Sequence, residues 1–413
     1  MLKNIISTLF TKGFVALTNL AILLISSNQL GSDVRGQISL LISNIAIIQI
    51  INEIYTGYVL VYFIPRYSLK KIYSLGIAWT IICVMLCALF FILFDIGIQE
   101  RWIHLGLLSF IIILHSFHMV IILAREKIKV YNFLNFMQPA LLLACLLLAI
   151  FGFNIKSVDS YIIALYISFM ASLLFSSFQL IKLFKNEKHD AKSDFEPKRI
   201  VENGFYNQLA NLCHMLSSRY NFYLLGNTIL VGIYSSASSL IESIWIISGS
   251  VSPIILSYIA NSKDPANNAR LTFLLAKICF LLSLLCVCIL YFIPRDFFVF
   301  LLGEDFIHVK TVMLYLSPGI LFISFATIIS HYFAGLGKQK ILLTANAFGL
   351  LAAICTSRYL ISRDQLLGAC YAANLSYLIA TLLLMVFFMK ENKLGILSLF
   401  EFKKDFEILK QTK

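Results

Sequence analysis

The sequence predicts an all-α integral membrane protein, with about twelve transmembrane helices in two pseudo-symmetric six-helix bundles around a central cavity. The first observation behind this prediction is composition: the 413 residues are 60% hydrophobic and only 13% charged, with a mean hydropathy of +0.86. A soluble domain of that composition would expose too much apolar surface. The second observation is length, because apolar runs of about 20 residues recur, enough for a helix to span the hydrocarbon, whereas barrel strands need only about 10.

Twelve apolar segments meet this length requirement. They cover residues 5–29, 37–64, 72–96, 103–123, 133–153, 160–183, 200–225, 228–260, 271–293, 309–333, 339–361 and 365–389. The first segment contains Lys12 well before any cleavage pattern of small residues, so we expect a retained span and not a signal peptide. An even number of spans puts both termini on the same side of the membrane.

Basic residues are distributed unevenly between the loops. With a cytoplasmic N-terminus, the inside segments hold Lys3, Arg66, Lys70, Lys71, Arg125, Lys127, Lys129, the 182–199 loop, Lys263, Arg270, Lys338, Lys340 and the tail from Lys390. The outside loops hold only Arg35, Arg101, Lys156, Arg295, Lys310, Arg358 and Arg363. This asymmetry, roughly threefold, follows the positive-inside rule and predicts that both termini are cytoplasmic. It also explains the net charge of +12 without nucleic acid as a partner.

A charged insert divides the chain near its middle. The stretch KLFKNEKHDAKSDFEPKR (182–199) predicts a cytoplasmic linker at 184–199 between an N-terminal bundle, 1–183, and a C-terminal bundle, 200–389, with a cytoplasmic tail at 390–413. Leu30-Gly31 followed by Gly36 recurs in the second half as Leu225-Gly226 followed by Gly232. Because each half has an even number of spans, the repeat is predicted to be parallel, with a transport cavity between the halves.

Polar residues recur at helical spacing inside the spans, and such residues are costly unless they face protein or water. Those of the first half are Thr8, Lys12, Asn19 and Ser26 on span one, and Asn44, Gln49, Asn52, Glu53, Tyr55 and Thr56 on span two. Those of the second half are Asn207, Asn211, His214, Ser218 and Asn221 on span seven, and Ser235, Ser238, Ser239, Glu242 and Ser243 on span eight. The stripes predict a wet or protein-facing side on these helices.

Several charged groups have more than one interpretation. Lys12 and Glu53 could form a buried ion pair that only fixes packing. Glu242 has no evident partner in the sequence and could be a protonated hydrogen-bonding group, while the serines around it could serve helix packing alone. Lys277 is expected to snorkel to the headgroups, and for Arg219 snorkelling and lining a cavity are equally consistent with its place on span seven.

Nothing in the sequence indicates an enzyme or a cofactor. There is no Walker A motif, catalytic triad or metal-ligand spacing, and the nine cysteines lie in or beside apolar runs without a CxxC pair. His115 and His118, one turn apart, are too few for a metal site. We therefore expect a protein that is not an enzyme, with no cofactor and no metal.

Three stretches resemble the polysaccharide-export flippases (Wzx type) of the multidrug/oligosaccharidyl-lipid/polysaccharide exporter superfamily. They are LGSDVRGQISLL (30–41), LLGNTILVGIYSSASSLIESIWIISGSVSPIIL (224–256), and LLGEDF (301–306) followed by LYLSPGILFISFATIISHYFAGLGKQK (314–340). The likeness extends over nearly the whole chain, including the plan of twelve spans. It departs at Arg219-Tyr220-Asn221, where family members often have an acid before the second Leu-Gly, and this puts ion coupling at that position in doubt.

The resemblance implies translocation of a polyprenyl-diphosphate-linked oligosaccharide from the cytoplasmic to the outer leaflet of the bacterial inner membrane by alternating access. A sugar chain needs a hydrated, hydrogen-bonding path and its diphosphate needs positive charge. The substrate-binding residues expected on this basis are Lys12 for the diphosphate, and Asn19, Asn52, Asn211, His214 and Arg219. Glu53 and Glu242 are the expected ion-coupling residues. The partners implied are the lipid-linked oligosaccharide, membrane lipids and polysaccharide-assembly machinery.

Three rival functions remain open at this stage. An ion-coupled multidrug exporter of the same superfamily would present an acid-lined cavity, whereas span one contributes Lys12. A polysaccharide polymerase or ligase would present a large outer loop, but the longest here, about 294–308, is short. A scaffolding subunit without transport activity would tolerate substitution of its cavity residues.

Overall fold

The computed structural model describes residues 2–94, 101–185, 197–261 and 265–393, and in this part of the chain all regular structure is helical. Nine helical stretches of the described residues are long and apolar enough to cross a membrane. Two of them, Phe10–Phe63 and Gln339–Asn392, contain a backbone break and so comprise two spans each. The more polar α7 (Pro197–Leu224) adds one helix of 28 residues, so the predicted all-α fold with about twelve spans is confirmed.

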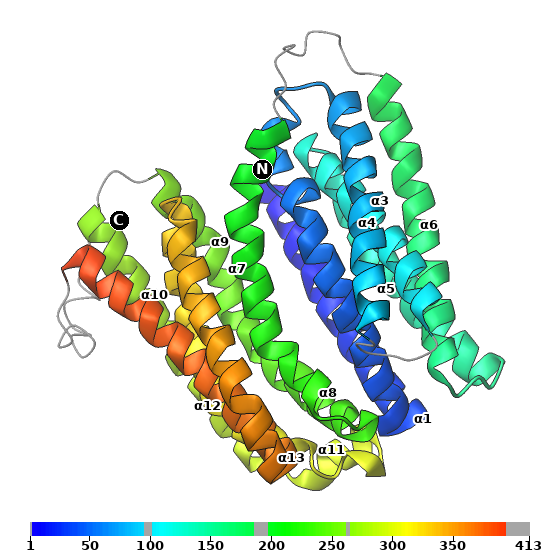
Figure 1. Cartoon of the computed structure of the whole chain (residues 1–413), viewed down its shortest axis with the longest axis vertical. Helices are drawn as coiled ribbons and strands as arrows, with labels where there is room; N and C mark the ends of the chain where they lie inside the picture. Colours follow the sequence, from blue (N-terminus) through cyan, green and yellow to red (C-terminus); the bar gives the residue numbers. More distant parts are fainter. Residues whose placement is uncertain (1, 95–100, 186–196, 262–264, 394–413) are drawn as a thin grey trace. The chain divides into compact units, whose positions relative to one another are not determined.

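Figure 1 shows the helices coloured in chain order. The first are α1 (Leu2–Thr56), α2 (Leu60–Phe63), α3 (Leu69–Leu93), α4 (Trp102–Ala124), α5 (Ile128–Leu147), which ends in a π-helical turn (Leu148–Gly152), and α6 (Val158–Lys185). After α7 come α8 (Thr228–Glu242), α9 (Ile246–Asn261), α10 (Pro265–Phe292), α11 (Arg295–Leu302), α12 (Val309–Gly335) and α13 (Gln339–Asn392). Most of the predicted linker and most of the predicted tail lie outside the described residues.

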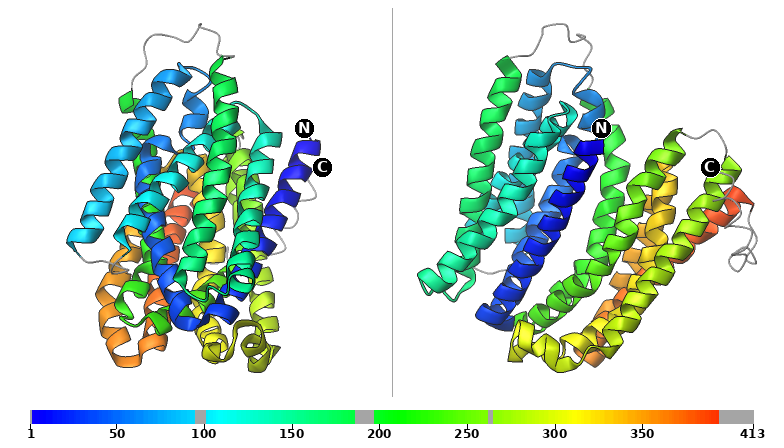
Figure 2. Two further views of the ribbon diagram at one scale, coloured as in Figure 1. Left: turned by 90° about the vertical axis from the view of Figure 1, so that its right-hand side faces the viewer. Right: turned by 180° about the vertical axis from the view of Figure 1, so that it is seen from behind.

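The chain divides into two compact units. Unit 1 comprises Met1–Gln208, Asn227–Gly232 and Leu301–Asp305, and unit 2 comprises Leu209–Gly226, Ile233–Phe300 and Phe306–Lys413. In unit 1, α4 packs against α3 and α6, and α5 packs against α1 and α6 (Figure 2). In unit 2, α12 packs against α9, α10 and α13. Each unit buries an apolar core of its own, because every amphipathic helix must cover its apolar face against protein or lipid.

Two glycines mark equivalent breaks in the two halves. Gly31 interrupts α1 with φ +78°, and Gly226 separates α7 from α8 with φ +65°. A residue with a side chain rarely adopts such a left-handed conformation, so each break needs a glycine. The predicted repeat therefore has the same backbone feature in both halves, as expected for pseudo-symmetric halves.

Close backbone contact inside unit 1 depends on two more glycines. A Cβ atom added to Gly36 would overlap the carbonyl oxygen of Thr228, and one added to Gly232 would overlap that of Ser32. The Thr228 hydroxyl donates to the Asp33 carboxylate at the same place. This close packing of small residues is typical of membrane helices.

The helix that restarts after Gly31 receives its cap from a distant part of the sequence. One carboxylate oxygen of Asp305 accepts hydrogen bonds from the Ser32 backbone N–H at 3.0 Å and from the Ser32 hydroxyl at 3.1 Å. The first N–H groups of a helix have no partner within the helix, so a carboxylate placed there stabilises the break.

The structure corrects three details of the predicted elements. Residues 243–245 form a 3₁₀ turn that interrupts the predicted span 228–260. The segment 294–308, expected to be an outer loop, contains the eight-residue helix α11. The short α2 also follows α1 within the predicted second span. Each feature is shorter than the window over which hydrophobic periodicity identifies a helix.

We predict that Gly36→Ala lowers the free energy of unfolding by about 1–3 kcal/mol, because the added methyl group meets backbone that cannot move without displacing α8. The measurement is thermal unfolding of the purified protein in detergent. Gly106→Ala on α4 is the matched control, since a Cβ atom there meets nothing within 4 Å and the change should be neutral or slightly stabilising. Equal melting temperatures for the two variants would contradict the close contact.

Candidate functional site

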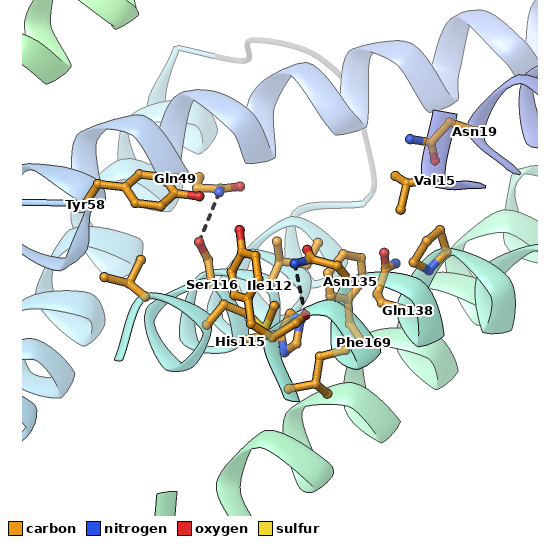
Figure 3. A pocket seen from close by; sticks show the side chains of 15 residues that line it. Val15, Asn19, Gln49, Tyr58, Ile112, His115, Ser116, Asn135, Gln138 and Phe169 are labelled. Carbon is orange, nitrogen blue, oxygen red and sulfur yellow. Dashed lines mark hydrogen bonds between the residues drawn. The ribbon is translucent and has the colours of Figure 1, made fainter. Parts of the chain in front are cut away.

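A pocket of about 270 Å³ opens inside unit 1 among α1, α4, α5 and α6. Its polar lining residues are Asn19, Gln49, Tyr58, His115, Ser116, Tyr131, Asn135 and Gln138 (Figure 3). Its apolar walls include Val15, Ile112 and Phe169. An amide-rich and hydroxyl-rich surface in a helical bundle offers hydrogen bonds to a polar ligand.

Hydrogen bonds connect the pocket to Glu53. The Gln49 side-chain N–H₂ donates to Glu53 Oε1 at 2.9 Å and to the Ser116 hydroxyl at 3.5 Å, and Ser116 also hydrogen-bonds to the Glu53 carboxylate. Gln49 and Glu53 meet because residues four apart lie on one face of a helix. The carboxylate therefore lies behind the pocket wall and not on the lining surface.

The residues that the sequence assigned to the first half occupy different positions. Asn19 lines the pocket, and Lys12 is exposed two helical turns earlier on the same face of α1, about 10 Å along the helix axis. Asn52 is fully buried, and its side-chain oxygen accepts from Thr56 at 2.6 Å and from Thr80 at 3.5 Å. Asn52 thus packs α1 against α3, which does not support its predicted contact with substrate.

Lys12 and Glu53 do not form the ion pair that the sequence left open, since Lys12 has no salt bridge among the described residues. The Glu53 carboxylate instead bonds to neutral groups. Lys12 therefore remains an exposed cation near a neutral pocket.

Sequence reasoning missed the contribution of α4 and α5 to this pocket. Ser116 comes from α4, and Asn135 and Gln138 come from consecutive turns of α5, directly before Pro139. The spacing of Asn135 and Gln138 was a usable signal, because residues three apart share a helix face.

The second half contains an ion pair inside the membrane-spanning region. Arg219 Nη2 on α7 lies 2.8 Å from Glu242 Oε2 at the end of α8, and only 23% and 15% of the two side chains are exposed. The guanidinium also lies 5.1 Å from the ring centre of Phe222. The expectation that Glu242 lacks a partner is wrong, as is snorkelling of Arg219, because each charge is neutralised by the other.

A hydrogen-bond network beside this pair is fully buried. Asn221 donates to the Ala369 carbonyl at 2.9 Å and to the Tyr234 hydroxyl at 3.3 Å, and it accepts from the Ser357 hydroxyl at 2.7 Å. These bonds join α7 to α8 and to both segments of α13. Since the amide uses both its donor and its acceptor groups on protein partners, Asn221 has a packing role.

Of the other predicted residues of unit 2, His214 is close enough to this pair to interact electrostatically with Arg219. His214 is half-buried with its ring 6.1 Å from that of Trp245, and Asn211 is exposed. Lys277 is 5% exposed and lies 4.7 Å from the centre of the Phe273 ring. The predicted snorkelling of Lys277 is therefore wrong, because its side chain is enclosed by protein.

Within the described residues no group of three or more His, Cys, Asp or Glu side chains could hold a metal ion. His118 is enclosed by its neighbours, with Nε2 2.9 Å from the Tyr73 hydroxyl and Nδ1 3.0 Å from the Ser176 hydroxyl. Its two ring nitrogens are therefore both occupied by structural hydrogen bonds.

Comparison with solved structures identifies the fold. The chain is similar to a lipid II flippase, MurJ, with a TM-score of 0.71 and 14% identity over 99% of this chain and 91% of that one. It is also similar to a multidrug resistance MATE family transporter of the MOP superfamily, with a TM-score of 0.69 and 14% identity over 92% of this chain and 94% of that one. A mutant of the Vibrio cholerae MATE transporter VcmN gives 0.55, with 15% identity over 95% and 93% of the two chains.

No family model matches the sequence, and no curated protein does. The structural likeness shows that the chain has the fold of MOP-superfamily transporters, and with its apolar helices it is a multi-pass membrane protein. At this level of identity the likeness concerns the fold alone.

We predict that Arg219→Met lowers the free energy of unfolding by about 3 kcal/mol or more, because it leaves the Glu242 carboxylate unpaired in a low-dielectric environment. Glu242→Leu should cost a similar amount, for the converse reason. Thermal unfolding in detergent should place the double variant closer to wild type than the sum of the single losses. Additive losses would show that the two charges are not energetically coupled.

Proposed function

We propose that this protein is a flippase, which moves a polyprenyl-diphosphate-linked oligosaccharide from the cytoplasmic to the outer leaflet by alternating access. The asymmetry of basic residues supports cytoplasmic termini in a bacterial inner membrane. In this proposal the protein is a transporter and not an enzyme, and the machinery of polysaccharide assembly supplies its cargo and accepts it afterwards.

The combination of Lys12 with the neutral pocket carries this proposal. A lipid-linked oligosaccharide has an anionic diphosphate joined to a sugar chain with many hydroxyl groups. Lys12 offers the diphosphate a positive charge, and the amides and hydroxyls that begin at Asn19 offer hydrogen bonds to a sugar. The spacing of about 10 Å along α1 suits two adjacent parts of one cargo.

The other roles follow from the positions of the side chains. Asn211 and His214 are proposed as further sugar contacts, since they are exposed and half-buried on α7. Arg219 can act as a second cation for the cargo only if the cargo replaces Glu242 as its partner. Glu53 and Glu242 are proposed as protonation switches.

The fold supports transport without deciding the substrate. One similar structure is of a lipid II flippase, which supports a lipid-linked cargo, and it aligns with 99% of this chain. A second candidate function is ion-coupled multidrug export, which the MATE likeness and the Glu53 carboxylate beside the pocket both favour. Against export of cations, Lys12 is a like charge on the same face of α1.

We predict that Lys12→Ala reduces flipping about tenfold or more, because a charge-assisted contact to the diphosphate is lost. The assay uses proteoliposomes that contain a fluorescent polyprenyl-diphosphate disaccharide, and it follows the fraction accessible to a membrane-impermeant glycosidase. Lys12→Arg should retain a large part of the rate, because it keeps the charge.

Lys70→Ala is the matched control, since Lys70 is an exposed lysine in the first turn of α3, and it should leave the rate unchanged. Normal flipping by Lys12→Ala would remove the proposed role of this residue. No flipping by the wild-type protein, together with increased drug resistance of cells that produce it, would favour the exporter.

A further inference from the structure

The pocket of unit 1 offers hydrogen-bonding groups that the protein itself leaves unused. The side-chain amides of Asn19 and Gln138 have no hydrogen-bond partner among the described residues. The amides of Gln49 and Asn135 donate within the protein, Asn135 to the Tyr131 carbonyl at 3.0 Å, but their side-chain oxygens have no partner in the described part of the chain. Asn135 and Gln138 are half-buried, and an unpaired polar group in the wall of a membrane protein is costly, so a ligand or water must complete them.

A buried histidine adds a second observation. His115 is 7% exposed and lines the pocket, yet its Nδ1 has no hydrogen-bond partner in the described structure. The backbone carbonyl of Asn135 lacks its usual helical donor as well, because Pro139 one turn later has no N–H. His115 lies on α4, and Pro139 lies on α5, the helix that also carries the pocket amides of Asn135 and Gln138.

The pocket has no net charge that would select an ion. No Lys, Arg, Asp or Glu belongs to its described lining. The nearest carboxylate, Glu53, already accepts hydrogen bonds from Gln49 and Ser116. The surface therefore matches an uncharged ligand with many hydroxyl groups better than it matches a cation.

Aromatic rings frame the same space. Tyr58 and Tyr131 hydrogen-bond to each other through their side chains, and the Phe169 ring lies 5.9 Å from that of His115 at 72°. Flat apolar faces beside convergent polar groups suit a sugar ring, which has C–H faces and an equatorial rim of hydroxyls.

The volume limits the ligand to a small unit. The pocket of about 270 Å³ lies just below the range of about 300–1,000 Å³ for sites that enclose drug-sized ligands. It has room for one sugar ring, and the rest of an oligosaccharide would remain outside.

We propose that this pocket is a subsite for one uncharged sugar ring of the cargo, and that Asn19, Asn135 and Gln138 determine which sugar it accepts. This inference rests on the proposed flippase function and adds a specificity site to it. The sugar could belong to the lipid-linked cargo or be a free sugar, and the chemistry of recognition is the same for both.

Binding is tested on the full-length protein in lipid nanodiscs by saturation-transfer difference NMR, which detects weak ligands. The probes are methyl glycosides of neutral and N-acetylated hexoses, glucuronic acid as an acidic sugar, and tetraphenylphosphonium as a cation. We expect a signal from at least one neutral glycoside and weaker or no signals from the two charged probes. Gln138→Leu and Asn135→Leu should each raise its dissociation constant about fivefold, the effect of one lost hydrogen bond.

Asn203→Leu is the matched control, because Asn203 is an exposed amide of unit 1 outside the pocket lining. It should bind the glycoside as the wild type does. Binding of the cation alone, or glycoside binding that is equal in all variants, would overturn the subsite.

Flipping assays with two lipid-linked cargoes that differ in one sugar identify the source of the ligand. A changed preference between the cargoes in Gln138→Leu supports a sugar of the cargo, and an unchanged preference overturns this assignment in favour of a free sugar. If the wild type flips the cargo but binds no glycoside, the subsite is wrong and the flippase function stands. If it binds the glycoside but does not flip, the proposed function is wrong instead.

Discussion

The arrangement of polar side chains in this protein follows from the free-energy cost of leaving a polar group unpaired in hydrocarbon. The bilayer core offers no water, so a buried charge or amide must find a partner in the protein or a water-filled space. Arg219 and Glu242 meet this requirement as a pair, and Asn221 meets it through three neighbours. Groups that do not meet it, such as the Gln138 amide, are therefore the informative ones, because only an external ligand or water can complete them.

The two halves use the same architecture for different purposes. Both contain a glycine-dependent break at the same place in their first helix pair. In unit 1 several polar side chains around the pocket have hydrogen-bonding groups without a protein partner among the described residues. In unit 2 polar side chains of α7 and α8 are paired within the protein, in Arg219–Glu242 and in the Asn221 network. Two halves with the same fold can therefore differ in how many of their polar groups are paired within the protein.

The helices and their breaks could be predicted because they depend on local properties, namely apolar length and glycine. The spans near Gly31 and Gly226 agree with the structure to within a few residues. Partners could not be predicted in the same way: the meeting of Arg219 with Glu242 depends on how α7 packs against α8, and the burial of Asn52 depends on α3. The spacing of Asn135 and Gln138 places both on one face of α5, but which helices face them depends on tertiary packing, so the pocket itself could not be predicted.

Glu53 and Glu242, the two carboxylates that were expected to couple transport to an ion, differ in their contacts. Protonation of Glu242 would leave the Arg219 guanidinium unpaired, and an uncompensated charge in that environment costs several kcal/mol. Glu53 bonds only to the neutral side chains of Gln49 and Ser116, so a proton can bind without stranding an opposite charge. Its hydrogen-bond partners also include pocket residues, so a change at Glu53 reaches the proposed sugar subsite directly. Glu53 is therefore the stronger candidate for the switch, and Glu242 can act as one only when an anion of the cargo has replaced it at Arg219.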